Sequence, residues 1–241
     1  MSGTPYQPHQ VIPRELAAVV KELPYWFVIG GHAVRCLCPY RPSRDVDFGV
    51  RKERDLRDLL AQLTRSGKTE VLERTADTVH LRWNDLDVSV FTLPLLEPFV
   101  EERRLTVTGV LATKLHAILD RGTRRDFFDL YVTLQGQRLG VVECLRAIRE
   151  VHHQEVNDSL LLRALTYFDD AEREDKLPGE GASDWRMVKT FFLAAVGALL
   201  VPPSVQLKIQ SRRVDVSDAP EPAAPRSAKA RRRRSAKRPR S

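Results

Sequence analysis

The chain has 241 residues, enough for one domain of ordinary size or two small ones, and 42% of them are hydrophobic. Its formal net charge is +7, but nine of the 39 basic residues lie between Pro225 and the C-terminus, where no acidic residue occurs. The remaining 30 basic residues oppose 32 acidic ones, so the part expected to fold is nearly neutral and the high isoelectric point comes from the tail.

Cysteine content and hydropathy exclude several classes of protein. Cys36, Cys38 and Cys144 are too few for a disulfide framework, and a Cys-x-Cys pair lacks the spacing of a zinc knuckle, so we expect buried free thiols. The first ten residues are too polar for a signal peptide. The longest apolar run, 191–201, is too short to cross a bilayer. We therefore expect a soluble protein of a reducing, cytoplasmic compartment, with no membrane partner.

Helices and strands alternate in the first half of the chain. Apolar periodicity predicts, in chain order, a helix over 14–23, a buried strand over 25–30, a short helix over 32–38, a strand over 45–50, a helix over 53–63 and strands over 78–83 and 86–91. The short segment "NDL" between the last two strands is typical of a tight turn, so these strands should form a hairpin.

The second half is helical. The spacing predicts helices over 109–122, 123–136 and roughly 141–153, 157–170 and 184–200, with Gly122 as a helix stop and Thr123 as an N-cap. We therefore expect an α+β fold in which a mixed sheet with flanking helices (1–108) precedes a helical lobe (109–205). The Pro-, Ala-, Ser- and Arg-rich segment 206–241 lacks apolar periodicity, and we expect it to be a disordered basic tail.

Two carboxylates occupy one face of the strand over 45–50. Strict alternation places Val46, Phe48 and Val50 on the opposite face from Asp45 and Asp47. Two carboxylates at this spacing can hold the divalent cations of phosphoryl transfer, and hard oxygen ligands favour Mg²⁺ or Mn²⁺. An ordinary solvated strand also explains an Asp-x-Asp pair taken alone.

A third acid could complete such a site. Asp87 lies on the polar face of the strand over 86–91, and it would join Asp45 and Asp47 if the two strands are neighbours. Asp85 is the weaker alternative because it falls in the turn. Gly30 and Gly31 precede a short helix, and glycines there let backbone N–H groups approach a polyphosphate, although paired glycines also mark many turns.

The order of these motifs resembles the nucleotidyltransferase superfamily that includes DNA polymerase β. It is more similar to the abortive-infection toxins of the AbiEii/AbiGii type. The motifs that carry the resemblance are the "GG-x-A" turn at Gly30–Ala33, the "R-x-S-x-D-x-D" run at Arg41–Asp47, and the later "K-L-x-A" and "R-x-x-x-R-D-x-x-D-L" pattern from Lys114 to Leu130. The resemblance covers roughly residues 14–170.

The resemblance implies transfer of a nucleoside monophosphate from an NTP to an acceptor. It implies a metal site of Asp45, Asp47 and Asp87, with Asp87 aligning or deprotonating the acceptor hydroxyl and with Lys114 and Asp126 completing the catalytic set. The residues it implies for nucleotide binding are Gly30, Gly31, Arg41, Ser43, Lys114 and Arg125. It also suggests a tRNA or other RNA acceptor and a cognate antitoxin. The wider superfamily usually has Gly-Ser where this chain has Gly30-Gly31, so a serine contact to phosphate is missing.

Local helix chemistry gives a simpler interpretation of some of these residues. Arg125 and Asp129 are spaced to form an i,i+4 ion pair, and Asp126 at a helix N-terminus is stabilising for any function. Lys114 borders an apolar stripe, so it reaches either solvent or a cleft. His32 is explained either by a polar helix start or by a phosphate contact.

Three functions remain open from sequence. The first is a Mg²⁺-dependent nucleotidyltransferase that modifies RNA as the toxin of a toxin–antitoxin system. The second is a nucleotidyltransferase that transfers AMP to a partner protein. The third is a non-catalytic nucleic-acid-binding protein, whose contact with a polyanion is made by the tail over 225–241.

Limited proteolysis tests the expectation for the tail. Residues 206–241 should be removed before any other segment, because a chain without an apolar core leaves its backbone open to a protease. Mass spectrometry of the first cleavage products would show this, and a tail that resists cleavage would contradict the expectation.

Overall fold

The computed structural model describes residues 5–153 and 156–201, which form ten α-helices, one 3₁₀-helix and seven strands. In chain order these are α1 (Pro8–Val11), α2 (Arg14–Val20), β1 (Phe27–Val28), α3 (Gly30–Leu37), β2 (Val46–Val50), α4 (Glu53–Ser66), β3 (Thr69–Arg74), β4 (Thr78–Trp83), β5 (Leu86–Thr92), η1 (Pro94–Phe99), β6 (Val100–Glu101), β7 (Arg104–Leu105), α5 (Val107–Asp120), α6 (Arg124–Gln137), α7 (Val141–His152), α8 (Asp158–Ala164), α9 (Asp169–Arg173) and α10 (Asp184–Leu200).

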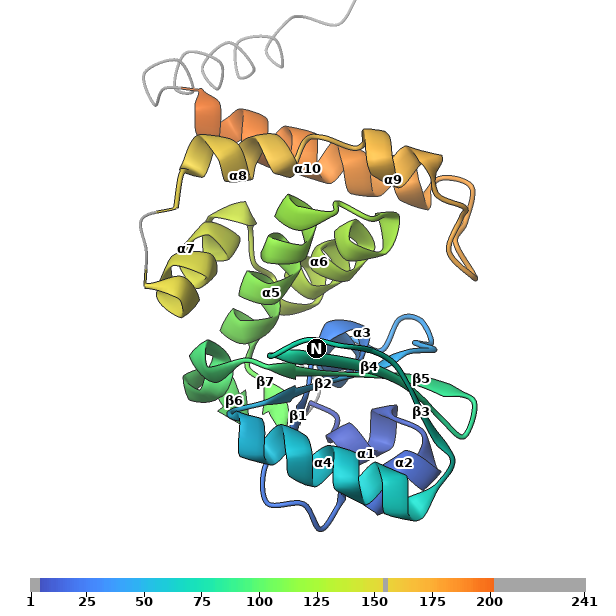
Figure 1. The fold of residues 1–241 in the computed structure, drawn as a ribbon. Coiled ribbons are helices and arrows are strands. Elements are labelled where there is room, and N and C mark those ends of the chain that lie inside the picture. Colours follow the sequence, from blue (N-terminus) through green and yellow to red (C-terminus); the bar gives the residue numbers. More distant parts are fainter. Residues whose placement is uncertain (1–4, 154–155, 202–241) are drawn as a thin grey trace, which may run out of the picture. The chain divides into compact units, whose positions relative to one another are not determined.

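All seven strands join one mixed sheet in the order β3-β4-β5-β2-β1-β7-β6. The pairs β2–β5 and β1–β7 are parallel, and the other neighbours are antiparallel. Helices α1, α2 and α4 lie on one side of this sheet, while α3 and the helices from α5 onward lie on the other (Figure 1). The fold is therefore α+β, with a mixed sheet and flanking helices, as the sequence predicts.

The alternation in β2 fixes which face of the sheet is apolar. Val46, Phe48 and Val50 are fully buried in a cluster that includes Leu16 of α2 and Leu59 of α4. Side chains alternate between the two faces of a strand, so the intervening Asp47 is directed to the side of α3 and α5. Burial of these apolar side chains makes a one-residue register slip of β2 costly, because it would exchange the two faces.

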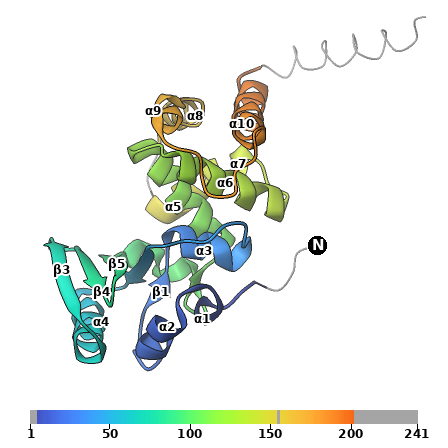
Figure 2. The same ribbon diagram turned by 90° about the vertical axis from the view of Figure 1, so that its right-hand side faces the viewer.

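A second apolar cluster holds the later helices together. Phe127 of α6 is its aromatic centre, with ring centroids 5.0 Å from Phe168, 5.9 Å from Trp185 and 5.7 Å from Phe192. The same cluster includes Phe27 of β1, so it joins these helices to the sheet. Figure 2 shows α8, α9 and α10 farthest from the sheet, with α5 between these three helices and the sheet.

The hairpin and most helices agree with the sequence predictions. Strands β4 and β5 pair antiparallel, and positive φ angles of 45° at Asn84 and 67° at Asp85 form the tight turn. The single helix predicted over 157–170 is wrong: the chain forms α8 and α9, separated by residues 165–168. The sequence predictions miss β3, an edge strand whose residues are mostly exposed, and the two-residue strands β6 and β7. These lack an alternating apolar pattern.

The described residues up to Leu200 belong to one compact unit, which contains the whole sheet. The predicted tail over 206–241 lies outside the described residues, and the division at residue 108 stays a prediction. All three cysteines are free, with Cys36 and Cys144 buried and Cys38 partly buried. Within the described part of the chain, no helix is both long and apolar enough to cross a membrane.

Gly49 provides a test of the packing beneath β1. It pairs with Phe27, and a Cβ at this position would lie 2.3 Å from the Phe27 ring. We expect Gly49→Ala to lower the free energy of unfolding by about 1–3 kcal/mol through overpacking. The control is Gly197→Ala in α10, where a Cβ meets no atom within 4 Å. There the helix propensity of alanine should leave stability unchanged or raise it by up to about 1 kcal/mol. Urea denaturation measures both, and equal effects would contradict the packing argument.

Candidate active site

Asp45 and Asp47 stand at the start of β2, on its non-apolar face. The Asp47 carboxylate forms no hydrogen bond or ion pair with any residue in 5–153 or 156–201. Burial raises the pKa of Asp47, the charge of Lys114 opposes this rise, and the neighbouring charge of Asp45 adds to it. A carboxylate in these surroundings lacks a compensating positive charge at short range, which is the condition under which a bound cation is most stabilising.

The paired glycines exist because two side chains approach the start of α3. Gly30 has φ +58°, and a Cβ there would lie 2.3 Å from Asp47 Oδ2. A Cβ at Gly31 would lie 2.7 Å from Ser43 Oγ. Both positions therefore exclude larger residues for steric reasons, and Gly30 also needs the left-handed backbone that glycine adopts at no cost. The glycines bring the backbone of α3 against the acids, so their conformation serves the site whether or not it contacts phosphate.

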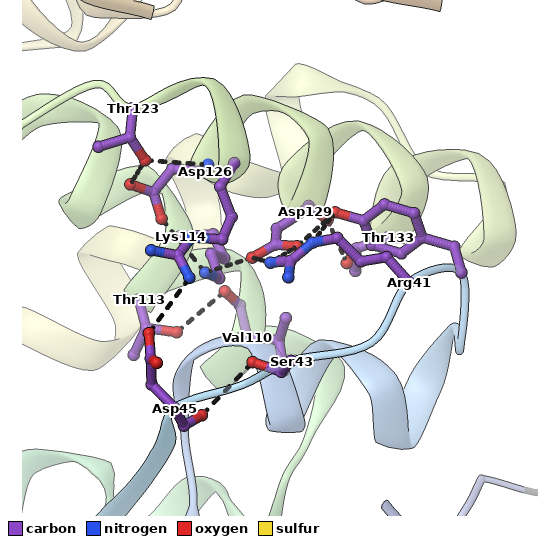
Figure 3. A network of polar contacts seen from close by, with 12 residues as sticks. Arg41, Ser43, Asp45, Val110, Thr113, Lys114, Thr123, Asp126, Asp129 and Thr133 are labelled. Carbon is purple, nitrogen blue, oxygen red and sulfur yellow. Dashed lines mark hydrogen bonds and ion pairs between the residues drawn. The ribbon is translucent and has the colours of Figure 1, made fainter. Parts of the chain in front are cut away.

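Lys114 of α5 is the centre of a buried network of charges (Figure 3). Its side chain is only 6% exposed, and its Nζ lies 3.2 Å from Asp126 Oδ1 and 2.6 Å from Asp129 Oδ2. Both aspartates belong to α6, and both are fully buried. Lys114 therefore does not extend to solvent, and its position is set by two carboxylates one helical turn apart.

Asp126 is held by donors on several sides. Arg121 donates two hydrogen bonds of 2.9 and 3.2 Å to its carboxylate, and the Thr123 hydroxyl donates a third of 2.5 Å. Burial alone would raise the pKa of Asp126, but the hydrogen bonds from Arg121 and Thr123 and the charge of Lys114 together hold it well below its usual range. Thr123 also caps α6, because its side chain accepts from the Asp126 N–H. With its lone pairs already engaged, Asp126 positions Lys114 and Arg121.

Asp129 connects the helices to the segment that precedes β2. Arg41 Nη2 lies 2.9 and 3.1 Å from the two Asp129 oxygens, and the Tyr40 hydroxyl donates a hydrogen bond of 2.5 Å. This arrangement contradicts the predicted i,i+4 pair of Arg125 with Asp129. The carboxylate is buried among Arg41, Tyr40 and Lys114, whereas the Arg125 side chain is exposed.

Arg125 instead contacts the candidate metal ligand Asp45. Its Nη1 lies 3.5 Å from Asp45 Oδ2, and the two side chains are 44% and 46% exposed. The exposure of both partners makes this a weak, screened ion pair. Among the described residues, Arg125 is the cationic side chain that pairs with Asp45, and this pair can be broken at small cost.

These groups open into one cavity of about 830 Å³. Its lining includes all the residues predicted for phosphate and metal binding except Arg41, namely Gly30, Gly31, Ser43, Asp45, Asp47, Asp87, Lys114 and Arg125. Because Val46 pairs with Val88 in parallel strands, Asp87 stands beside Asp45 on the same face of the sheet. The Asp87 carboxylate is more than half exposed, and it pairs with Arg82 at 3.2 Å.

The residues fit a Mg²⁺ or Mn²⁺ ion. Among the described residues, no group of three or more His, Cys, Asp or Glu side chains is arranged to hold a metal, so Asp87 is not assembled with the other two. Mg²⁺ is commonly bound by one or two carboxylates together with substrate phosphates, and the uncompensated Asp47 beside Asp45 supplies such a pair. The ligand set is therefore one that a nucleotide would complete.

The sequence matches, over residues 14–210, the family model described as nucleotidyl transferase AbiEii toxin of a type IV toxin–antitoxin system. The chain belongs to this family of nucleotidyltransferases. An uncharacterized protein of Aquifex aeolicus strain VF5 is 24% identical to this chain over 176 residues, which are 69% of this chain and 84% of that protein.

Solved structures similar to this chain share little sequence with it. JHP933 from Helicobacter pylori has a TM-score of 0.44 and 15% identity, covering 86% of this chain and 94% of JHP933. The antibiotic-resistance factor ANT(2'')-Ia has a TM-score of 0.45 and 12% identity, covering 58% of this chain and 89% of ANT(2'')-Ia.

Most of the predicted site residues line the cavity, but three residues considered for the site do not. Arg41 and Asp126 do not line it: each is engaged in the buried network beneath Lys114. His32 is also outside the lining, and burial, with a smaller effect of Arg35, lowers its pKa to about 4, so it is neutral and brings no charge to phosphates.

Sequence analysis gave no site role to Tyr40, or to Arg121, which it placed only in the family motif. Tyr40 and Arg121 complete the network around the two aspartates of α6. Thr123 is the N-cap that the sequence predicts, and Arg121 lies two residues before it, so both are close to Asp126 along the chain. The approach of Tyr40 to Asp129, 89 residues away, has no local signal.

Asp126→Asn tests whether the buried network stabilises the folded chain. The change removes a buried charge that compensates Lys114 and Arg121, so we expect the free energy of unfolding to fall by about 3 kcal/mol. Asp77→Asn is the matched control, because Asp77 is exposed and its carboxylate has no ion pair among the described residues. Equal thermal melting temperatures for the two variants would show that the network contributes little.

Proposed function

We propose that this toxin transfers a nucleoside monophosphate from an NTP to an RNA acceptor, with Mg²⁺ or Mn²⁺ as cofactor. The observation that carries the proposal is the Asp47 carboxylate, which has no ion-pair partner among the described residues and stands beside Asp45 in a cavity that Lys114 also lines. Phosphoryl transfer needs paired acids and a positively charged side chain in a fixed position, because its catalysis is mostly positioning and charge stabilisation.

Each group at the cavity has a distinct task in this proposal. Asp45 and Asp47 hold the cation, which when bound neutralises charge on the phosphate oxygens. Lys114, held by its two aspartates, donates to the triphosphate without losing its orientation. The backbone at Gly30 and Gly31, the Ser43 hydroxyl and the exposed guanidinium of Arg125 are the remaining contacts for phosphate.

The chemical step is a displacement at the α-phosphorus of the NTP. The oxygen of an acceptor hydroxyl forms a bond to this phosphorus, the bond from phosphorus to the bridging oxygen of the β-phosphate breaks, and pyrophosphate leaves. The hydroxyl proton passes to Asp87, which lies next to Asp45 and is open to solvent.

An RNA acceptor is supported by charge and by the room in the cavity. A cavity of about 830 Å³ is roomy for a nucleotide, and such sites typically span about 300–1,000 Å³. The run of basic residues over 225–241 is suited to a polyanion, and its attraction would raise the local concentration of RNA. A cognate antitoxin is expected from the family to which the chain belongs.

Transfer of label from α-³²P-NTPs to total tRNA tests the proposal. Asp45→Asn and Asp47→Asn should each reduce transfer by about 100-fold or more, since the cation supplies several kcal/mol of charge stabilisation. Asp47→Asn should not lower thermal stability, because the native carboxylate has no hydrogen-bond or ion-pair partner among the described residues.

The control for this experiment is Asp77→Asn, which should retain full transfer. Chelation of divalent cations should abolish transfer by the unaltered chain, and added Mn²⁺ should restore it. Label that follows a partner protein in place of RNA would support the alternative of protein modification. The absence of label on any acceptor, with every NTP, would refute a transferase role.

A further inference from the structure

Two histidines from different helices form a stacked pair on the wall of the cavity. His116 of α5 and His152 of α7 have ring centroids 5.6 Å apart and ring planes inclined by 20°. Both line the cavity, and His116 is exposed while His152 is partly exposed. Neither imidazole forms a hydrogen bond or ion pair within 5–153 and 156–201. The pair therefore offers ring faces and free ring nitrogens that the fold does not use.

The pair stands apart from the acids and Lys114 on the same wall. Helix α5 turns 100° per residue, so His116 projects about 160° around the helix from Lys114, with Thr113 and Ala117 between them. All four residues line the cavity. On the wall that α5 forms, Lys114 lies at the edge nearest Asp126 and Asp129, and His116 lies at the opposite edge. A ligand with a charged end and a flat end could therefore contact both.

Strands β4 and β5 contribute further aromatic groups to the same cavity. His80 and Phe91 pack edge to face with ring centroids 5.6 Å apart, and His80 Nδ1 shares a hydrogen bond of 2.8 Å with Ser89 Oγ. Both residues line the cavity, as do Leu93, Pro94 and Leu95 after β5. The cavity thus has aromatic and apolar walls on these strands, which suit a flat heterocycle better than a phosphate.

Charge supports the same assignment. Burial lowers the pKa of His152, and the nearby His116 lowers it further. The other ionisable side chains that α5 and its C-cap contribute to the cavity are Lys114, Asp120 and Arg121, and both Lys114 and Arg121 are already engaged by Asp126. A neutral imidazole favours stacking over binding of an anion. Nucleobases stack on aromatic rings, histidine included, in a manner that tolerates many sequences.

We propose that the His116–His152 pair is a nucleobase-stacking subsite of this cavity. The inference rests on the proposed function, which places a nucleotide with its phosphates at Asp45, Asp47 and Lys114. The base it takes belongs either to the incoming NTP or to the unpaired end of an RNA acceptor. Both sources present the same flat heterocycle, and the experiment separates them.

Binding to two probes, measured by isothermal titration calorimetry in the presence of Mn²⁺, tests the subsite. The first set of probes is the non-hydrolysable α,β-methylene analogues of ATP and CTP, and the second is an RNA hairpin with a short single-stranded 3′ end. The double variant His116→Ala/His152→Ala should weaken binding of at least one probe by about 10-fold or more. A loss confined to the nucleotide analogues assigns the subsite to the NTP, and a loss confined to the hairpin assigns it to the acceptor.

Two further variants separate stacking from a merely structural role. His116→Phe/His152→Phe keeps flat rings without ring nitrogens, so it should bind the affected probe nearly as tightly as the unaltered chain. His153→Asn is the control, because His153 is exposed, does not line the cavity and has φ 49°, a conformation that asparagine tolerates. It should bind both probes normally.

The proposal is overturned if the double alanine variant binds both probes as the unaltered chain does, or if the phenylalanine variant is as weak as the alanine variant. An unaltered chain that binds neither probe overturns it as well. These readouts are independent of turnover. The proposed function fails on the absence of label transfer, whereas the subsite fails on unchanged affinity.

Discussion

The ammonium of Lys114, buried between two carboxylates of α6, is the interaction on which the rest of the site depends. Taking charges out of water is costly unless each is paired and hydrogen-bonded, and here the pairing is extensive. Asp126 is shared with Arg121, and Asp129 is shared with Arg41. Three cations thus surround two carboxylates, so the network has a surplus of positive charge beside the acids of β2. That surplus complements the negative charge of the phosphates that we propose the site holds.

The same network sets the geometry of the chain on both sides of the cavity. Arg41 and Tyr40 precede β2, so their bonds to Asp129 fix the segment that delivers Asp45 and Asp47. Lys114 and Arg121 fix α5 against α6. Arg125 completes the arrangement differently, through a weak pair with Asp45 at the surface. A bound metal ion and nucleotide would replace the Arg125–Asp45 pair with stronger contacts. In the free protein this weak pair therefore leaves the Asp45 carboxylate available for a cation.

Local patterns in the sequence were sufficient for four neighbouring strands of the sheet, β4, β5, β2 and β1, and for the shared face of Asp45 and Asp47. The parallel pairing of β2 with β5, which places Asp87 on the same face, is known only from the structure. Sequence was insufficient where a role depends on tertiary partners. Asp129 could be assigned a neighbour four residues away, but the fold gives it Arg41 and Tyr40, nearly ninety residues distant. The stacking of His116 on His152 likewise depends on the packing of α5 against α7, which no spacing along the chain reveals.

The contact between Gly31 and Ser43 explains how this chain differs from the Gly-Ser turn usual in the superfamily it resembles. The space that a side chain at position 31 would enter is already filled by the Ser43 hydroxyl. The hydroxyl is therefore present at this end of the cavity but comes from the segment before β2 rather than from α3. Positions 31 and 43 behave as one steric unit with room for a single hydroxyl. In related chains we expect them to vary together, so that a serine gained at the first position is accompanied by a smaller residue at the second.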